Sequence, residues 1–202
     1  YIVAALVPAV LAASAFVGQK SPAVLSAFFL LLSMAPFFLR FERSRPQART
    51  IVPLAMLAAL AVIGRVAFAF APNFKPTTAI VMVAGFCFGP SAGFLTGSVT
   101  ALASNFFFGQ GAWTPWQMAA WGLTGLLAGL FRPTRLVRSP LALAGLGAGA
   151  SLLYGVVMNL WHVIGFIRPL TGTTVLAAYI AGLPFDLAHA ASTAVFLLAL
   201  GR

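Results

Sequence analysis

The sequence predicts an all-α protein that crosses a membrane several times. Of its 202 residues, 61% are hydrophobic and 7% are charged, whereas soluble domains carry about 25% charged and about 45–50% apolar residues. The apolar residues form continuous runs, as membrane helices require, and do not alternate with polar ones as in a lipid-facing barrel. Arginines gather in short segments between these runs, which is typical of loops on one side of a bilayer.

Eight apolar runs are candidates for spanning helices, which need about 20 residues each. We expect them at about 1–17, 22–40, 51–71, 77–90, 91–108, 115–131, 140–161 and 174–200. The first run has no basic segment before it and leads into a second apolar run, so we interpret it as a membrane helix and not as a signal peptide. The fourth and fifth are short, and Gly89-Pro90-Ser91 between them predicts a tight turn.

The basic residues predict how the chain is oriented. With eight spans, the loops after the second and sixth spans and the C-terminus fall on one side, which the positive-inside rule assigns to the cytoplasm. That side receives Arg40, Arg43, Arg45, Arg49, Arg132, Arg135, Arg138 and Arg202, and the other side only Lys20, Lys75 and Arg168. We therefore expect a bacterial cytoplasmic membrane protein with both termini in the cytoplasm. Topology explains the net charge of +10 better than binding to nucleic acid does.

The basic segment 41–50 also predicts a boundary. Two helices without polar features precede it (1–40), and six helices that hold most of the unusual residues follow it (51–202). Several kinds of chemistry are disfavoured. Cys87 is the only cysteine, the chain has no phosphate-binding loop ending in Lys-Ser or Lys-Thr, and it contains two acidic residues in all. We expect no metal site, no cofactor and no ATP hydrolysis by this chain itself.

Polar residues inside the predicted spans are costly in lipid and usually functional. Arg65 lies in the third span, and Asp186 and His189 lie one helical turn apart in the last. Asn159 and His162 lie at the outer end of the seventh span. Arg65 and Asp186 could pair and lock two helices together, or could line a polar cavity, and both interpretations can hold at once.

Two outer loops combine aromatic and polar residues. The first contains Phe74 and Lys75, and the second extends from Asn105 to Gln117. Aromatic residues at a membrane boundary are often simple anchors. Amide, glycine and threonine residues interleaved with aromatics are more typical of a ligand pocket, which is mostly apolar with a few polar groups.

Small residues recur at four-residue spacing in three spans, as Ala55 and Ala59, Gly93 and Gly97, and Gly125 and Gly129. Such spacing lets helix backbones approach closely. It serves packing within the chain or docking of a partner, and the spacing alone does not distinguish the two uses.

The region from 51 to 202 resembles the substrate-binding S component of energy-coupling-factor (ECF) vitamin transporters. The resemblance is carried by Pro72-Asn73-Phe74-Lys75-Pro76, Gly89-Pro90-Ser91-Ala92-Gly93-Phe94, Ser104-Asn105-Phe106-Phe107-Phe108-Gly109-Gln110-Gly111 and Trp113-Thr114-Pro115-Trp116-Gln117-Met118. The two leading helices depart from the six-helix core of that family. They resemble an extension found in some actinobacterial and clostridial members.

The resemblance implies a membrane receptor that takes a vitamin or related micronutrient from outside. It implies assembly with a coupling transmembrane subunit and two cytoplasmic ATPase subunits, and docking of the coupling subunit on Ala55 and Ala59. A cobalamin-type cargo is favoured, while queuosine precursors, pantothenate and riboflavin stay open. The expected substrate-binding residues are Phe74, Lys75, Asn105, Phe108, Gln110, Trp113, Trp116, Gln117, Asn159, His162, Asp186 and His189. Trp121 lies deeper in its span, so we expect it to matter less than Trp116.

Three other classes stay open. A stand-alone permease would pair discontinuous helices from an internal repeat, and no convincing repeat is visible. An intramembrane enzyme would use Asp186 and His189. A purely structural subunit would have no need of the aromatic outer loops.

Overall fold

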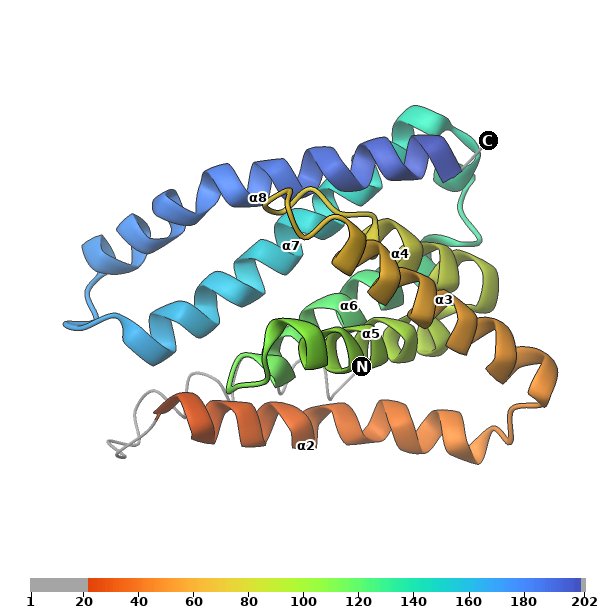
Figure 1. Cartoon of the computed structure of the whole chain (residues 1–202), viewed down its shortest axis with the longest axis horizontal. Helices are drawn as coiled ribbons and strands as arrows, with labels where there is room; N and C mark the ends of the chain where they lie inside the picture. Colours follow the sequence, from red (N-terminus) through yellow and green to blue (C-terminus); the bar gives the residue numbers. More distant parts are fainter. Residues whose placement is uncertain (1–21, 201–202) are drawn as a thin grey trace.

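The computed structural model describes residues 22–200, which form seven α-helices and one short 3₁₀ helix and contain no strand. The helices are α2 (Pro22–Arg43), α3 (Ala48–Ala67), α4 (Thr77–Phe88), α5 (Pro90–Phe108), α6 (Thr114–Phe131), η1 (Arg135–Arg138), α7 (Pro140–Phe166) and α8 (Gly172–Leu200). Figure 1 shows them as one bundle, with α2 along one side and the α7–α8 hairpin along the other. The all-α prediction is confirmed. The predicted span 1–17 lies outside the described residues.

Each of the seven predicted spans from 22 onward corresponds to one observed helix. The predicted break between the fourth and fifth spans falls at Gly89, which has a φ of 93° and ends α4. Positive φ is readily available only to glycine. Pro90 then begins α5, where its missing N–H costs no hydrogen bond. Within the described part, α3, α7 and α8 are both long and apolar enough to cross a membrane.

Glycines hold α4, α5 and α6 together at the centre of the bundle. A Cβ added at Gly93 would overlap the carbonyl oxygen of Gly125, and one at Gly97 would overlap that of Trp121. A Cβ at Gly85 on α4 would also meet Gly125. The small-residue pairs of the fifth and sixth spans are therefore packing residues within the chain, where they let backbones touch.

The third small-residue pair lies differently. Ala55 and Ala59 are exposed on α3. Their neighbours include exposed apolar side chains, such as Met56 at 66% and Ile63 at 62% of full accessibility. Ala55 also forms part of an apolar groove of about 290 Å³ between α2, α3 and α5.

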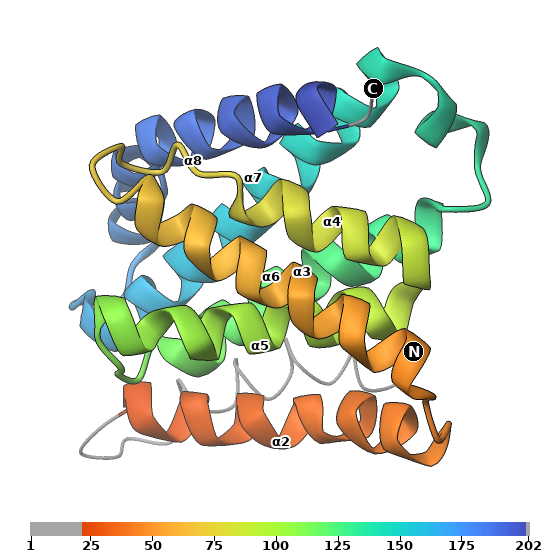
Figure 2. The same cartoon turned by 45° about the vertical axis from the view of Figure 1, so that its right-hand side comes forward.

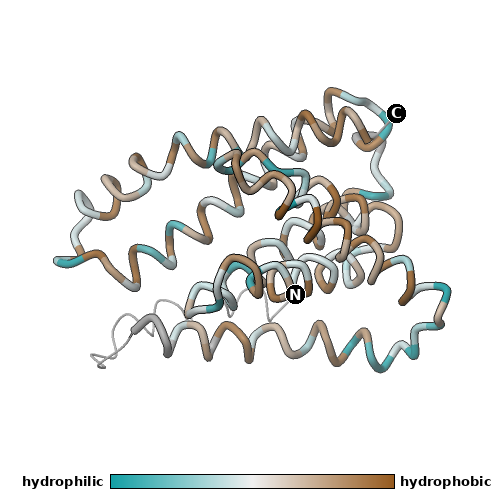
Figure 3. The backbone as a smooth tube through the Cα atoms, viewed as in Figure 1, coloured by the Kyte–Doolittle hydropathy of each residue, from teal (hydrophilic) through white to brown (hydrophobic). Residues whose placement is uncertain are grey.

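The connections between helices separate into two ends of the bundle. Figure 2 shows the α2–α3 turn, η1 and the end of α8 towards one end, and the α3–α4, α5–α6 and α7–α8 loops towards the other. Figure 3 shows apolar residues along the helices and a hydrophilic group at the α2–α3 turn. The arginine-bearing connections and the aromatic loops thus occupy opposite ends, as the sequence predicts.

Candidate functional site

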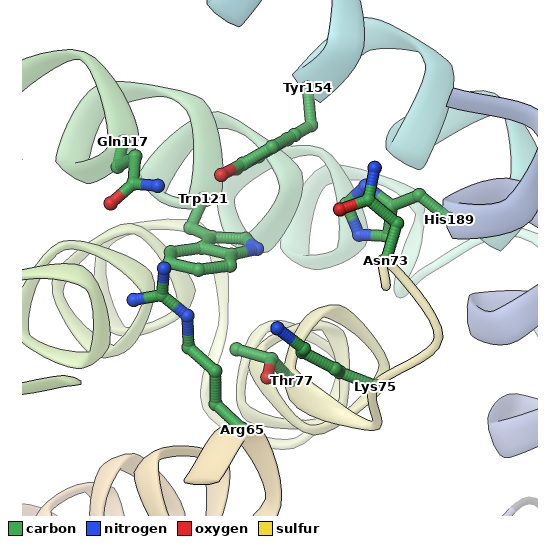
Figure 4. A pocket seen from close by; sticks show the side chains of 8 residues that line it. All are labelled: Arg65, Asn73, Lys75, Thr77, Gln117, Trp121, Tyr154 and His189. Atoms are coloured by element: carbon green, nitrogen blue, oxygen red, sulfur yellow. The ribbon is translucent and has the colours of Figure 1, made fainter. Parts of the chain in front are cut away.

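A small polar cavity lies beneath the α3–α4 loop, at the end of the bundle opposite the arginine-bearing connections. Its volume is about 100 Å³. Five helices and the loop contribute side chains to it, as Figure 4 shows. The lining residues are Arg65 of α3, Asn73 and Lys75 of the loop, Thr77 of α4, Gln117 and Trp121 of α6, Tyr154 of α7 and His189 of α8.

The α3–α4 loop is fastened to α8. Asn73 has a φ of 55°, a left-handed conformation that asparagine tolerates better than most residues. Its Nδ2 donates to the carbonyl oxygen of Phe185 at 3.1 Å, and Ser192 Oγ donates to the carbonyl oxygen of Lys75 at 2.9 Å. Phe74 packs against Phe196 with ring centroids 5.6 Å apart. These contacts hold the loop over the cavity, with the Lys75 side chain among the lining groups (Figure 4).

Arg65 is the buried cation of the site, with 8% of its surface exposed. Its Nη1 donates to Ser104 Oγ and, at 2.8 Å, to Asn105 Oδ1. The Cζ atom lies 4.5 Å from the ring centroid of Phe108 and 4.8 Å from that of Trp121, distances at which a cation is attracted to an aromatic face. Amide, hydroxyl and aromatic groups thus hold the guanidinium in place.

Lys75 is the second cation. Its Nζ lies 5.1 Å from the ring centroid of Phe108, so this ring contacts both positive charges. Burial, and secondarily the nearby Arg65, hold the pKa of Lys75 below its usual value, because both disfavour the charged form.

A chain of hydrogen bonds joins Trp121, Thr78 and His189 on the side of the cavity formed by α4, α6 and α8. Trp121 Nε1 donates to Thr78 Oγ1 at 2.9 Å, and this oxygen lies 2.6 Å from His189 Nε2. Tyr154 packs edge-on against the His189 ring with centroids 4.9 Å apart. Thr78 is fully buried, so α4, α6, α7 and α8 meet at one fixed point.

A second network supports the cavity from the α5–α6 side. Asn105 is almost fully buried, and its Nδ2 donates to Thr114 Oγ1 at 3.0 Å and to Gln117 Oε1 at 2.8 Å. Thr114 in turn donates to Gln110 Oε1 at 2.9 Å. Asn105 and Gln110 therefore position Arg65, Gln117 and the loop, and do not line the cavity themselves.

The structure brings some of the expected binding residues together and separates others. Lys75, Gln117 and His189 line the cavity, and Phe108 contacts its two cations. Phe74 packs on α8 beside it. Trp116 lies instead in the buried core with Phe94 and Leu30. Trp121, which we expected to matter less than Trp116, lines the cavity, so the geometry reverses the expected order of the two.

Four more residues of the expected binding set lie outside this cavity. Trp113 packs edge-on against Trp161, and His162 stacks on Phe166 at an exposed position. Asn159 Nδ2 donates to Asp186 Oδ2 at 2.8 Å. These contacts belong to the α5–α6 loop and the α7–α8 hairpin, outside this cavity.

Arg65 and Asp186 do not pair with each other. Arg65 bonds to α5, as above, and Asp186 bonds to Asn159, where Gly155 leaves room for its carboxylate. Helix register explains the outcome, because Asp186 faces α7 while His189, one turn on, faces α4. Of the two interpretations of Arg65, the cavity-lining one agrees with the geometry.

The binding set expected from the sequence lacks five of the lining residues: Arg65, which was weighed there as a cavity residue, and Asn73, Thr77, Trp121 and Tyr154. Asn73 and Thr77 flank Lys75, so the loop motif itself pointed to them. Trp121 lies four residues after Gln117, hence on the same face of α6, and this spacing was an available signal. Tyr154 lies within a long apolar run, and no local pattern distinguishes it.

A bundle of apolar helices with a polar cavity between them defines a polytopic membrane protein with a candidate small-molecule site. The family of ECF transporter substrate-specific components matches residues 49–201, and the chain belongs to that family. The resemblance of residues 51–202 to a substrate-binding component of ECF transporters is therefore confirmed.

Individual relatives are similar over part of their length. A UPF0397 protein of Vibrio atlanticus is 35% identical over 89 residues, which cover 42% of this chain and 48% of the relative. A UPF0397 protein of Aliivibrio salmonicida is 34% identical over 89 residues, with the same coverage. The chain therefore spans about half the length of the curated relatives it matches. No solved structure matches the chain significantly.

Proposed function

We propose that this chain captures a small organic nutrient outside the cell and delivers it through a coupling subunit and two cytoplasmic ATPases. The observation that carries the proposal is the cavity, where five helices and one loop bring polar side chains to a single point. Polar groups converging in an otherwise apolar protein are the usual mark of a ligand site.

The proposed orientation places the cavity end outside and both termini in the cytoplasm. Its support is the separation of the arginine-bearing connections from the cavity end, together with the positive-inside rule. In this proposal α3 to α8 form the six-helix substrate-binding core, and residues 1–40 form a two-helix addition joined to it by the basic segment 41–50.

We propose that the coupling subunit docks on α3 at Ala55 and Ala59. Both are exposed, unlike the glycine pairs of α5 and α6. Small side chains on an apolar helix face permit close approach of a second helix in lipid. The groove beside Ala55 offers room for side chains of such a partner.

The cavity volume bears on the cargo. Pockets for drug-sized ligands measure about 300–1,000 Å³, whereas this one measures about 100 Å³. Cobalamin is the largest of the vitamins considered. This volume therefore does not support the cobalamin-type cargo that the sequence favours. We therefore favour a cargo smaller than cobalamin, or one of which only a part enters the cavity.

Uptake into proteoliposomes tests the proposal. The chain reconstituted with the coupling subunit and ATPases should accumulate a nutrient only when ATP is present, and the chain alone should bind it without accumulating it. Concentrative uptake by the chain alone would show a stand-alone permease and overturn the proposal.

A further inference from the structure

We propose that the cavity binds the anionic head group, a carboxylate or a phosphate, of a small organic acid. Arg65 and Lys75 would be the charge partners of this group. The inference rests on the proposed function and narrows its substrate class. Three observations carry it: the balance of charge around the cavity, the direction of its hydrogen bonds and its size.

The cavity holds positive charge without a counter-charge. Two of its eight lining residues are cationic and none is acidic. The whole chain contains two acidic residues, Glu42 and Asp186. Glu42 lies on α2 beside arginines, and Asp186 is bound by Asn159 in the α7–α8 hairpin. Buried charges are normally paired, so an anion from outside would complete the site.

Arg65 and Lys75 still have N–H groups that do not donate to a protein acceptor. Within the described residues, both hydrogen bonds of the Arg65 side chain leave from Nη1, so Nη2 and Nε have no protein acceptor there. Lys75 Nζ contacts the Phe108 ring and likewise has no acceptor there. A guanidinium with a free edge matches the two oxygens of a carboxylate or phosphate.

The hydrogen bonds around the cavity consume acceptors and leave donors. Gln117 Oε1 accepts from Asn105, so the N–H₂ group of Gln117 is directed towards the hydroxyl of Tyr154, another lining residue. Thr78 Oγ1 accepts the proton of Trp121, so its own proton is available to His189 Nε2. The His189 ring then carries its proton on Nδ1. The supporting hydrogen bonds therefore leave mainly donor groups at the cavity wall, and an anion needs such donors.

The amide of Asn73 offers an acceptor at the mouth of the cavity. Asn73 Nδ2 donates away from the cavity to Phe185, so its Oδ1 is the group left at the exposed mouth. A ligand with a hydroxyl or amide N–H beside its acidic group would satisfy it. Trp121 and Tyr154 present aromatic surface across the cavity from Lys75 and Thr77 (Figure 4).

The size of the cavity suits a head group and not a whole vitamin. Its volume of about 100 Å³ is well below the about 300–1,000 Å³ of pockets that enclose drug-sized ligands. A carboxylate or phosphate fits this space, and the body of the ligand would extend past Asn73 and Lys75.

Three probes with the same ring test the charge requirement on the full chain in lipid nanodiscs. Benzoate carries a carboxylate, phenyl phosphate a phosphate, and benzamide a neutral head of similar shape. We expect at least one anionic probe to bind about ten-fold more tightly than benzamide by calorimetry, because each ten-fold step corresponds to one good interaction. Which anion binds more tightly distinguishes a carboxylate cargo from a phosphate cargo.

Two variants and a control locate the effect. Lys75→Gln should remove most of the preference for the anion, while Arg168→Gln, which removes a charge from the exposed α7–α8 loop, should leave it unchanged. Arg65→Gln should have the larger effect. If that variant does not fold, Lys75→Gln decides the question.

The inference is overturned if benzamide binds as tightly as both anions, if none of the probes binds, or if Lys75→Gln leaves the preference intact. ATP-dependent uptake in proteoliposomes is measured independently. A neutral ligand that is still taken up would therefore refute the anion site and leave the proposed transport function standing.

Discussion

The two kinds of small-residue pair in this chain have the same spacing and different surroundings. Gly93 and Gly125 face each other inside the bundle, so closely that neither has room for a methyl group. Ala55 and Ala59 face outward from α3. Small residues at four-residue spacing make a helix face flat enough for a second helix to approach closely. The residues around that face determine whether a helix of the same chain or of a second protein can pack there.

The two tryptophans of α6 show the same division. Trp116 is completely buried in the core, and its Nε1 has no hydrogen-bond partner among the described residues. Trp121 lines the cavity and donates to Thr78. One packs in the core and the other lines the candidate site, although they lie five positions apart on the same helix.

The largest effect on the chain should come from Gly125→Ala. The new methyl group would overlap the backbone of Gly93, and overpacking of this kind costs about 1–3 kcal/mol or more. Gly145→Ala is the matched control, because nothing lies within 4 Å of its added Cβ and alanine favours a helix by up to about 1 kcal/mol. Thermal unfolding in detergent should show a lower melting temperature for the first variant alone. Equal melting temperatures would contradict the packing role.

A smaller effect should separate the two tryptophans. Trp121→Phe removes the hydrogen bond from Trp121 to Thr78 and so weakens the hydrogen-bonded chain that holds His189 in place. We expect the anionic probe to bind about ten-fold more weakly to this variant. Trp116→Phe removes an N–H without a described partner and should leave probe affinity unchanged. Calorimetry on both variants checks this, and equal losses would place the binding site elsewhere.

The smallest effect on the isolated chain should come from Ala55→Leu combined with Ala59→Leu. Both positions are exposed, so stability should change by no more than about 0.5 kcal/mol and probe affinity should not change. Co-purification with the coupling subunit should fall sharply. The control is Ala177→Leu with Ala181→Leu, an exposed pair with the same spacing on α8. Unchanged co-purification of the α3 variant would remove this face as the docking site.

Much of the fold could be predicted from the sequence, because lipid imposes simple rules. Continuous apolar runs give helices, and Gly89-Pro90 gives the break between α4 and α5. Helix ends are set by local chemistry, as at Ser139, whose side chain accepts from the backbone of Ala142 at the start of α7. These signals act over a few residues and are therefore visible in the sequence.

The site could be predicted only in part, because it depends on which faces of distant helices meet. The loop motif identified Lys75, and the polar residues in spans identified His189 and Arg65. Asp186 was misleading because its carboxylate turns towards Asn159 on α7. Tyr154 enters the cavity through the packing of α7 against α6 and α8, which no short-range pattern reveals.

Native mass spectrometry of the gently purified chain tests the central claim most directly. Wild-type protein should carry a small organic acid, and the Lys75→Gln variant, purified in parallel, should have lost most of it while Arg168→Gln retains it. A bound neutral molecule retained equally by all three proteins would contradict the account of the cavity.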